Sequence, residues 1–323
     1  MRPNPRSTPI PPLPYIAIDW GTSRRRAYLV VEGQVRKHVA DDRGARAVTD
    51  FGSELAQVRA ILGDFPVVMA GMVGSSVGWS VVPYASLPVD AAALARGARH
   101  VADRAWIVPG ICQVQPAAAG GEVAAKTLRG DVMRGEEVQF LGAQAAGLVG
   151  PEGLLCQPGT HCKWAWIEHG VLTRFATAMT GELFALLQGG GSLIAASLDG
   201  PLPTAPFAPD GAFLRGVAEG ARRDLAASLF RLRADALLGL RAEGEGAAFA
   251  SGVLIGADVA ARLDETPTDT VHLVADEGLG DLYAAAIVAL GRSVVRLASD
   301  VAFMAGMAPI AAQILACPQG DAA

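Results

Sequence analysis

Two stretches of the chain, about 140 residues apart, share one layout: a short apolar strand, a Gly-Thr turn, a second strand, another turn and a third strand. In the first stretch, residues 16–18 lead into Gly21-Thr22 and residues 27–31 follow. In the second, residues 154–156 lead into Gly159-Thr160 and residues 163–167 follow. A repeat of this size predicts two related units that are each built around a β-hairpin.

The two turns have the composition of anion sites. A Gly-Thr turn directs backbone N–H groups and a hydroxyl into one small concavity, which favours a phosphate oxygen. A single Asp-x-Gly-Thr would serve only as a turn about half the time, but its repetition strengthens the functional interpretation. We therefore predict that the two turns hold a nucleotide tail from both sides, with these candidate residues: Gly21, Thr22 and Ser23 in the first, and Gly159, Thr160, His161 and Lys163 in the second.

The rest of the chain alternates strands and helices, which is typical of an α/β fold. Its 323 residues suit two domains of comparable size. We expect a disordered Pro-rich tail over 1–14, a first domain over 15–135 and a second over 136–300, with a closing helix at 301–317 that can pack back on the first. Further expected helices are at 50–62, 134–148, 213–232, 247–263 and 281–290, and strands at 66–70, 105–108, 270–275 and 294–297.

Composition excludes several classes of protein. A formal net charge of -5 gives no basic footprint for nucleic acid. The four cysteines are scattered, so a disulfide framework or a structural zinc site is not expected, and reduced thiols fit a cytoplasmic protein. Residues 1–14 lack the apolar core of a secretion signal, and 301–317 falls short of the ~20 apolar residues of a membrane span. Homo-oligomer formation is left open.

A glycine-rich loop follows the strand at 66–70. It contains Gly71, Gly74, Ser75 and Ser76 and ends at Trp79. In open α/β sheets, ligands bind at the carboxyl ends of strands. The position of this loop therefore predicts a binding surface.

Several runs then resemble the 2-dehydro-3-deoxygalactonokinase family, within the actin-like superfamily of sugar kinases, acetate kinases and chaperone ATPases. They extend from about residue 15 to about residue 310 and keep the family's order. Such long runs are far more specific than any short pattern. They are Ile18-Asp19-Trp20-Gly21, residues 67–75 (VVMAGMVGS), residues 132–137 (VMRGEE), residues 158–164 (PGTHCKW), Met179-Thr180-Gly181-Glu182 and residues 251–257 (SGVLIGA).

This resemblance implies two ribonuclease-H-like (actin-like ATPase) domains with a nucleotide and substrate cleft between them. The first domain would bind the sugar acid and the second the nucleotide. The implied activity is transfer of the ATP γ-phosphoryl group, with Mg²⁺, to the 6-hydroxyl of 2-dehydro-3-deoxy-D-galactonate. The products would be the 6-phospho sugar acid and ADP, in galactose and galactonate catabolism.

Phosphoryl transfer needs in-line positioning, charge neutralisation and a base. Glu136 and Glu137 are candidates for the base, because the start of the interdomain helix supplies that carboxylate in related sugar kinases. Asp19 is the rival, and is also a candidate for holding a water of Mg²⁺. Acids at a helix start also have a purely structural explanation in the helix dipole, at roughly one in three. Asp300 either helps to position the metal or caps the last helix.

The carboxylate of the acceptor needs a guanidinium, because arginine binds carboxylates bidentately. Arg26 and Arg134 are the candidates. Arg24 and Arg25 are weaker, because consecutive residues of a strand point to opposite faces. Trp79 is either an apolar wall of the site or a core residue. The full set expected to bind the sugar acid is Trp20, Arg26, Gly71, Met72, Gly74, Ser75, Ser76 and Trp79, with Arg134 counted among the catalytic residues.

One loop departs from the family pattern. Where the family places a glycine-rich adenosine loop, this chain has Asp276 and Glu277 before Gly278. These acids would repel a polyphosphate, so they face the ribose or adenine, or the nucleotide is held weakly. Gly278 remains a candidate for contacting the nucleotide.

Two alternatives stay open: a kinase for another 2-keto-3-deoxy sugar acid, and a non-catalytic sugar-acid sensor with the same fold. The acidic loop is the only feature that favours the sensor. P-loop kinases and Rossmann dehydrogenases are excluded, because their glycine motifs are absent.

Overall fold

The computed structural model describes residues 13–116, 128–189, 191–208, 211–266 and 268–316. The expected disordered tail therefore lies outside the described residues, apart from Leu13 and Pro14. The chain divides into two compact units. Unit 1 comprises Met1–Cys112, Val132–Gly142 and Phe303–Ala323, and unit 2 comprises Gln113–Asp131 and Ala143–Ala302.

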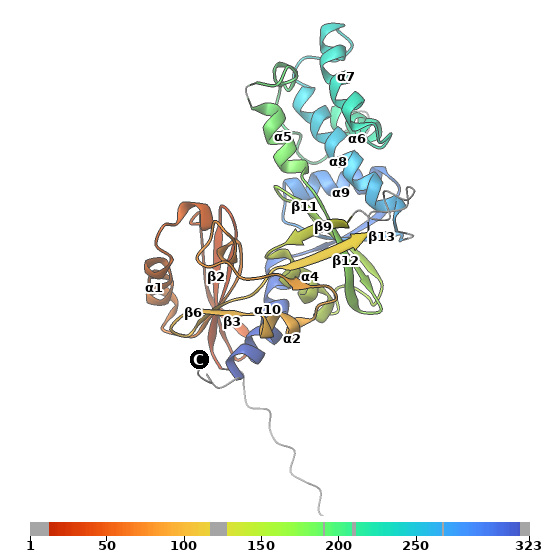
Figure 1. The fold of residues 1–323 in the computed structure, drawn as a ribbon. Helices are drawn as coiled ribbons and strands as arrows, with labels where there is room; N and C mark the ends of the chain where they lie inside the picture. The colour runs from red at the N-terminus through yellow and green to blue at the C-terminus, as the bar shows by residue number, and fades with distance from the viewer. Residues whose placement is uncertain (1–12, 117–127, 190, 209–210, 267, 317–323) are drawn as a thin grey trace, which may run out of the picture. The chain divides into compact units, whose positions relative to one another are not determined.

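Unit 1 is built on a six-stranded sheet in the order β3-β2-β1-β4-β7-β6 (Figure 1). β1, β4 and β7 are parallel, whereas β2, β3 and β6 run antiparallel to their neighbours. The carboxyl ends of β1 and β4 therefore meet at one edge of the sheet. The strands are β1 (Tyr15–Trp20), β2 (Arg25–Val31), β3 (Gln34–Asp41), β4 (Val67–Gly71), β6 (Arg99–Ala102) and β7 (Ala105–Ile107).

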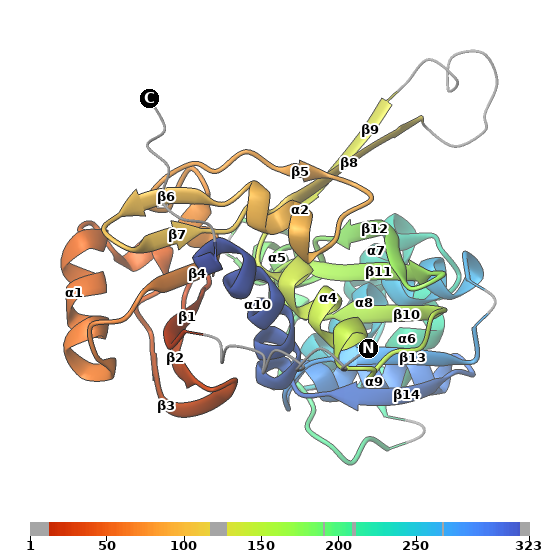
Figure 2. The same cartoon turned by 90° about the horizontal axis from the view of Figure 1, so that it is seen from below.

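Helices cover both faces of this sheet. α1 (Phe51–Leu62) begins after Asp50, whose carboxylate accepts the Ser53 N–H, and lies on one side of the sheet, with α10 (Ser299–Ala316) on the other (Figure 2). On the α1 side, alternate strand residues form one core with the helix, as a period of two requires. On the other side, Phe303 of α10 packs beside Tyr28. Gly306 lies so close to the Val138 carbonyl of α4 (Glu136–Ala145) that no side chain would fit there.

Short elements complete the first part of the chain. They are η1 (Ala45–Ala47), η2 (Met72–Gly74), α2 (Ala91–Arg96) and a three-stranded sheet in the order β5-β8-β9, with β5 (Ala85–Ser86), β8 (Ile111–Pro116) and β9 (Leu128–Met133).

Unit 2 contains a five-stranded sheet in the order β12-β11-β10-β13-β14. β10, β13 and β14 are parallel, and β11 and β12 are antiparallel. The sheet thus repeats the order of five of the six strands of the unit 1 sheet, β3-β2-β1-β4-β7. Its strands are β10 (Gly153–Gln157), β11 (Cys162–Glu168), β12 (Val171–Ala178), β13 (Thr270–Val274) and β14 (Ser293–Leu297).

The helices of unit 2 pack around α8, which is almost wholly buried in the unit's core. The expected single helix over 213–232 was wrong, because the chain breaks after Gly220, where Arg223 adopts a φ of +64°. Asp224 then caps a second helix through the Ala227 N–H. The elements are α5 (Thr180–Gln188), η3 (Ala195–Ser197), α6 (Ala212–Gly220), α7 (Leu225–Leu237), α8 (Gly246–Asp264) and α9 (Leu279–Ala289).

The β1-β2-β3 and β10-β11-β12 hairpins match in backbone detail. Each connects its second and third strands through two residues of positive φ, Glu32-Gly33 in unit 1 and His169-Gly170 in unit 2. Each also has a register shift three residues after the cation at the matched position. The shift lies between Leu29 and Val30, after Arg26, and between Trp166 and Ile167, after Lys163. The predicted repeat is therefore present in the backbone, and the chain is a mixed α/β protein.

Two helices are long and apolar enough to satisfy the length and composition of a membrane span. The relevant window is 83% buried in α8 and 44% buried in α10. A core helix of a soluble protein meets the same criteria, so this is weak evidence for a membrane.

Candidate active site

Asp19 lies at the carboxyl end of β1, on the face of the sheet opposite to α1. Its strand neighbours Ile18 and Trp20 are fully buried, and both belong to the α1-side core. Trp20 packs against Phe51 and donates its indole N–H to the Arg43 carbonyl at 2.8 Å. Trp20 was expected to bind substrate, but its burial leaves no surface for a ligand, so we assign it to the core.

The two arginines of β2 point to opposite faces of the sheet, and Arg24 lies before the strand begins. Arg25 is buried on the α1 side, where it pairs with Glu54 at 2.9 Å and stacks on Trp20. Arg26 is the register partner of Asp19, and its Nε lies 3.6 Å from Asp19 Oδ2. The Arg26 side chain is 36% exposed and that of Asp19 15% exposed. Both groups are therefore near the surface and open to a ligand.

Two glycines bring the loop after β4 and the start of α4 against this strand end. Gly71 has a φ of +99°, and a side chain there would come within 2.7 Å of the Trp20 carbonyl. Gly135 has a φ of +112°, and a side chain there would come within 3.1 Å of Gly71. Only residues without a side chain allow these backbones to approach so closely. The segments that carry Asp19, Gly71 and Glu136 are thus packed together.

The two glutamates at the start of α4 differ in exposure. Glu136 is half-buried, and its Oε2 accepts the Arg134 N–H at 3.2 Å. Glu137 is fully buried; its Oε2 accepts the Gly135 N–H at 2.7 Å, while Oε1 is buried without a hydrogen bond to any described residue. Glu136 can meet a ligand, whereas Glu137 acts on the backbone turn.

Burial raises the pKa of two of these carboxyl groups. The pKa of Asp19 rises to about 6, mainly by desolvation; Arg26 opposes the rise and Glu136 adds to it. The pKa of Glu137 rises to about 8, again mainly by desolvation, with Glu136 as the second cause. Glu136 is therefore electrostatically coupled to both groups, and three carboxyl groups share this edge of unit 1.

Arg134 contacts the glycine-rich loop after β4 and the segment that follows it. Its Nη2 donates to the Val82 carbonyl at 2.7 Å, and its guanidinium lies 4.4 Å from the centre of the Tyr84 ring. A side chain at Gly74 would come within 2.8 Å of Nη1. Nε and Nη1 are buried and have no hydrogen-bond partner among the described residues. The contacts of Arg134 therefore tie the loop to the start of α4.

The loop itself presents polar groups unevenly. The Ser75 hydroxyl donates to the Met72 carbonyl at 2.7 Å and accepts the Val77 N–H at 3.3 Å, so it is used within the loop. Ser76 is exposed. Met72 packs against the α1-side core. Of the predicted side chains here, Ser76 is the most accessible to a ligand.

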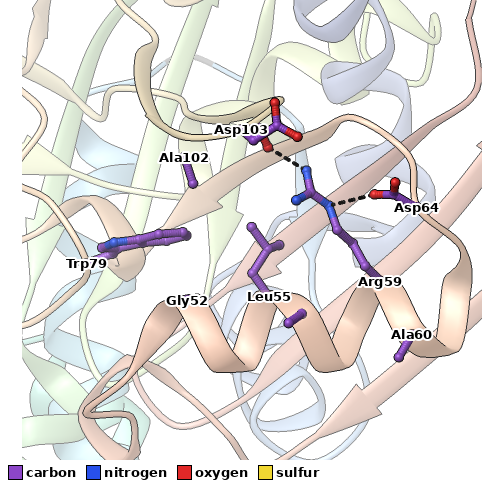
Figure 3. Close-up of a pocket in the computed structure, with 9 residues that line it drawn as sticks. Gly52, Leu55, Arg59, Ala60, Asp64, Trp79, Ala102 and Asp103 are labelled. Atoms are coloured by element: carbon purple, nitrogen blue, oxygen red, sulfur yellow. Dashed lines mark hydrogen bonds and ion pairs between the residues drawn. The ribbon is translucent and has the colours of Figure 1, made fainter.

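Trp79 belongs to the α1 side of unit 1. Its ring stacks on Phe51 at 6.1 Å with an 11° angle between the planes. It lines a surface groove of about 420 Å³ together with Leu55 and Arg59 of α1 (Figure 3). Asp19 points to the opposite face, so Trp79 is a packing residue and not a wall beside Asp19.

The first Gly-Thr turn is braced by the segment after β3. The Gly21 N–H donates to the Arg24 carbonyl at 2.9 Å, and the carbonyls of Gly21 and Thr22 accept the N–H groups of Ala45 and Arg46. Ser23 is exposed and Thr22 half-buried. The turn is held while its hydroxyls stay near the surface.

The second Gly-Thr turn is braced by the start of α5. A side chain at Gly181 would come within 2.6 Å of the Gly159 carbonyl, and the Glu182 N–H donates to the Thr160 carbonyl at 2.9 Å. The exposed His161 Nε2 lies 2.5 Å from Glu182 Oε2. His161 thus already has an acidic partner, which weakens its expected role as a phosphate ligand.

Lys163 is buried, contrary to the expectation that it is solvated or bound to phosphate. Its Nζ donates to Thr177 Oγ1 at 2.8 Å, and Thr177 Oγ1 donates to Asp131 Oδ1 at 2.6 Å. Its register partner is Gln157, whose Oε1 is buried without a hydrogen bond to the described residues. The cation of the second hairpin is therefore engaged in the sheet.

Gly278 lies at the start of α9, just after the end of β13. Since β13 is parallel to β10, this helix start and the Gly159-Thr160 turn lie at the same edge of the unit 2 sheet. The Gly278 N–H donates to Asp281 Oδ2 at 2.9 Å. Asp276 and Glu277 are exposed. A helix N-terminus favours an anion, and these acids work against it.

A chain of hydrogen bonds connects the start of α5, which braces the Gly159-Thr160 turn, with α9, which begins after Gly278. The sequence analysis did not predict it. Tyr283 of α9 lies 2.8 Å from Thr180 Oγ1 at the start of α5. Its hydroxyl also donates to Asp258 Oδ2 at 3.1 Å, which accepts the Trp164 N–H at 3.0 Å. Only the resemblance of the Met179–Glu182 run signalled this region, because Thr180 and Tyr283 are far apart in sequence.

The structure also tests where a metal could bind. Within the described ranges, no three His, Cys, Asp or Glu side chains converge as metal ligands. Asp19 nevertheless has a carboxylate with no hydrogen bond to the described residues, and one carboxylate with several waters is a usual Mg²⁺ site. Asp300 is exposed in unit 2, and its Oδ1 accepts the Val301 N–H at 2.8 Å.

Comparison with known proteins places this arrangement in a family. The sequence pattern of the 2-keto-3-deoxy-galactonokinase family matches residues 19–310. The chain is 38% identical over 307 residues to the 2-dehydro-3-deoxygalactonokinase of Escherichia coli K12, covering 92% of this chain and 97% of the relative. It is 33% identical over 315 residues to a probable 2-dehydro-3-deoxygalactonokinase of Rhizobium meliloti 1021, covering 93% and 97%.

A crystal structure of a candidate 2-dehydro-3-deoxygalactonokinase from Sinorhizobium meliloti superposes with a TM-score of 0.81 at 31% identity, covering 94% of this chain and 100% of that one. Sequence and fold therefore agree over almost the whole length. The chain belongs to the 2-keto-3-deoxy-galactonokinase family.

Proposed function

We propose that this chain is an ATP-dependent kinase that phosphorylates the 6-hydroxyl of 2-dehydro-3-deoxy-D-galactonate. The reaction forms a bond from the sugar O6 to the γ-phosphorus, breaks the bond to the β,γ-bridging oxygen and releases ADP. Family membership supports the substrate pair. The observation that carries the proposal is the meeting of Asp19, Arg26 and Glu136 at one edge of unit 1.

We also propose a more specific fold for the two units. Each unit would be one ribonuclease-H-like domain of an actin-like ATPase, with nucleotide and substrate bound in a cleft between them. The shared strand order and the matched hairpins support a duplicated domain. On this view unit 1 binds the sugar acid and unit 2 the nucleotide.

Arg26 is our candidate for the carboxylate of the acceptor. It is partly exposed, and its Nε contact with Asp19 at 3.6 Å is long enough to leave its guanidinium available. Bidentate pairing with a carboxylate would use donors in a fixed planar geometry. Arg134 is the weaker candidate, because its contacts hold the loop that carries Gly71, Gly74 and Ser76.

Glu136 is our candidate for the general base. It is open to a ligand and stands at a helix start, whereas Glu137 is fully buried. Glu136 would take the proton of the 6-hydroxyl as the oxygen attacks phosphorus. Asp19 remains the alternative base, since its pKa of about 6 leaves it mostly ionised at neutral pH.

Asp19 would hold Mg²⁺ through water. Direct ligation by several acids fits less well, because no three acidic, His or Cys side chains of the described residues converge there. Magnesium would neutralise charge on the transferred phosphoryl group. Asp19 would orient that hydrated ion, and Arg26 beside it would limit repulsion between the carboxylates. Asp300 would assist from the start of α10.

The phosphates of ATP would lie against the Gly159-Thr160 turn. The brace from Gly181 and Glu182 holds the backbone of this turn through the Gly159 and Thr160 carbonyls. The start of α9 at Gly278 is the weaker candidate, because its N–H already donates to Asp281 and two acids precede it. The first turn, with Thr22 and Ser23, would face the transferred phosphoryl group. Closure around the ligands would exclude water and suppress futile hydrolysis.

The decisive experiment measures ADP release in a coupled assay over a panel of 2-keto-3-deoxy sugar acids, with and without Mg²⁺. We expect 2-dehydro-3-deoxy-D-galactonate to stimulate ATP consumption most. A larger kcat/KM for another sugar acid would assign that substrate instead. If no acid stimulates ATP consumption while the ligands still bind, the protein is a sensor.

The site of action would be the cytoplasm. Two observations support this location: the chain belongs to a family of metabolic kinases, and Cys112, Cys156 and Cys162 are free thiols.

A further inference from the structure

Asp258 is a buried acid of unit 2 for which the proposed chemistry has no use. It lies on α8, and its side chain is 2% exposed. Its Oδ2 accepts two hydrogen bonds, from the Trp164 indole N–H at 3.0 Å and from the Tyr283 hydroxyl at 3.1 Å. A carboxyl group is costly to bury unless such bonds compensate the lost water. The partners of Asp258 therefore indicate which elements it holds together.

The direction of the hydrogen bonds beyond Asp258 follows from the donors that are present. The Tyr283 hydroxyl has a single proton, and it donates that proton to Asp258. The second contact of the Tyr283 hydroxyl, 2.8 Å from Thr180 Oγ1, must then use the proton of Thr180. The Thr180 hydroxyl is therefore committed to Tyr283 and does not donate to a phosphate.

The first turn of α5 has few other contacts with the core of unit 2. Its N-cap residue, Met179, makes no side-chain hydrogen bond to the helix. None of the nine residues of α5, all of them described, is buried. Phe184 and Leu187 pack against the core, but they belong to the later turns of the helix. On the core side, the first turn is therefore held by the bond from Thr180 to Tyr283.

This first turn of α5 is also the part that braces the Gly159-Thr160 turn. The Glu182 N–H donates to the Thr160 carbonyl at 2.9 Å, and a side chain at Gly181 would come within 2.6 Å of the Gly159 carbonyl. Backbones this close cannot move independently, so a shift of the start of α5 would shift the turn. Asp258 also holds β11, the strand that follows the turn, through the bond from the indole.

We propose that Asp258 is a positioning residue for ATP. Through Tyr283 and Thr180 it fixes the start of α5, and through α5 it fixes the Gly159-Thr160 turn. This role rests on the proposed function, which assigns the phosphates of ATP to that turn. A purely structural acid would affect stability alone, whereas a positioning acid also sets the affinity for ATP and leaves the acceptor site unchanged.

Titration calorimetry of the full chain with ATP and Mg²⁺, in the absence of the sugar acid, tests this role. Asp258→Leu is similar in size and has no acceptor, so we expect the Kd for ATP to rise about 10- to 30-fold, as the loss of two hydrogen bonds implies. The KM of the sugar acid should not change. Asp258→Asn keeps an oxygen that can accept both bonds, so its Kd should stay within about 3-fold of the wild type.

The matched control is Thr266→Val. It removes a similar bond, because Thr266 Oγ1 accepts the N–H of the other β11 tryptophan, Trp166, at 2.6 Å. That bond has no connection to α5. Thr266→Val should therefore lower stability and keep the wild-type affinity for ATP.

Variants of Thr180 decide the question if Asp258→Leu does not fold, because Thr180 is only half-buried. Thr180→Ala should raise the Kd for ATP about 3- to 10-fold, and Thr180→Ser, which keeps the hydroxyl, should restore it. Wild-type affinity in Thr180→Ala, or in a folded Asp258→Leu, overturns the positioning role and leaves the proposed kinase function standing.

Amide hydrogen exchange supplies a readout that needs no ATP. The Glu182 N–H should exchange faster in Thr180→Ala and Asp258→Leu than in the wild type, because the bond to the turn opens more often. The Gly170 N–H, bonded to the Pro151 carbonyl beyond the other end of β11, should keep its rate. Equal rates at Glu182 overturn the positioning role. A wild type that binds no ATP refutes the proposed function, and the role of Asp258 with it.

Discussion

The hairpins of the two units share a backbone and differ in chemistry. At matched positions, unit 1 has Asp19 opposite Arg26, and unit 2 has Gln157 opposite Lys163. The unit 1 pair is partly exposed, with a long contact of 3.6 Å. In unit 2 the acid is replaced by an amide, and the lysine is buried against Thr177. The same backbone can therefore hold an exposed, loosely contacting pair in one unit and a buried, hydrogen-bonded one in the other.

This difference explains where charge is available for a ligand. The carboxylate of Asp19 is accessible to a metal ion, and the guanidinium of Arg26 is accessible to an anion. Lys163 is already engaged with Thr177, so we expect unit 2 to offer backbone N–H groups at its Gly-Thr turn. Reactivity should thus depend on side chains in unit 1 and on backbone placement in unit 2.

The largest effect should come from the acids of unit 1. We expect Glu136→Gln to lower kcat by about 10² to 10⁴, because the attacking hydroxyl loses its base, with little change in the KM of either substrate. The steady-state ADP-release assay measures this. Glu152→Gln, at an exposed acid of unit 2, is the matched control and should keep wild-type turnover. A normal kcat in Glu136→Gln with a large loss in Asp19→Asn would transfer the base role to Asp19.

Glu137 should affect stability in a pH-dependent way. Because its pKa is raised to about 8 in the fold, the folded state holds the proton more tightly than the unfolded chain. The unfolded chain loses this proton near pH 4.5, whereas the folded chain keeps it until about pH 8, so stability falls progressively between these two pH values and the loss is constant above them. Glu137→Gln removes this titration, so it should be more stable than the wild type by a few kcal/mol at pH 8.5, with the advantage shrinking toward pH 5.

Urea unfolding of both proteins at pH 5, 7 and 8.5 measures this difference. All other titrating groups are common to the two proteins, so the pH dependence of the difference reports Glu137. A difference that does not change with pH would show that Glu137 ionises in the fold as it does in the unfolded chain.

Local patterns in the sequence were enough to predict the repeat and most strands, because strand periodicity is encoded in adjacent residues. The burial of Trp20 and the packing of Trp79 on Phe51, by contrast, could not be predicted from local patterns. Which face of a strand or loop meets a helix depends on partners distant in sequence, here Phe51. The break between α6 and α7 depends on the φ of Arg223, which periodicity does not reveal. The contact of Thr180 with Tyr283 joins residues 103 positions apart and leaves no local signal.

Arg26 should set the affinity for the acceptor. Arg26→Met should raise the KM of the sugar acid roughly 10- to 100-fold, since a charged hydrogen bond contributes about 1.5 to 3 kcal/mol. Because Arg26 lowers the pKa of Asp19, the same variant should shift the acidic limb of the kcat profile to higher pH. Arg24→Met is the matched control, because Arg24 is 82% exposed beside it. Equal KM changes in both variants would remove Arg26 from the acceptor site.

The smallest effect should come from the buried chain of unit 2, where Tyr283→Phe removes one hydroxyl and keeps the ring in its packed position. Asp258 Oδ2 still accepts the Trp164 N–H, so the unit should stay folded, but the start of α5 loses its bond from Thr180. We expect the KM for ATP to rise about 3- to 10-fold, as loss of one hydrogen bond implies, with the KM of the sugar acid unchanged. Thr180→Val should reproduce the effect, and the double variant should add nothing further, because both changes break the same bond. A rise in the KM of the sugar acid instead would mean that the two units do not divide acceptor and nucleotide as the hairpin comparison requires.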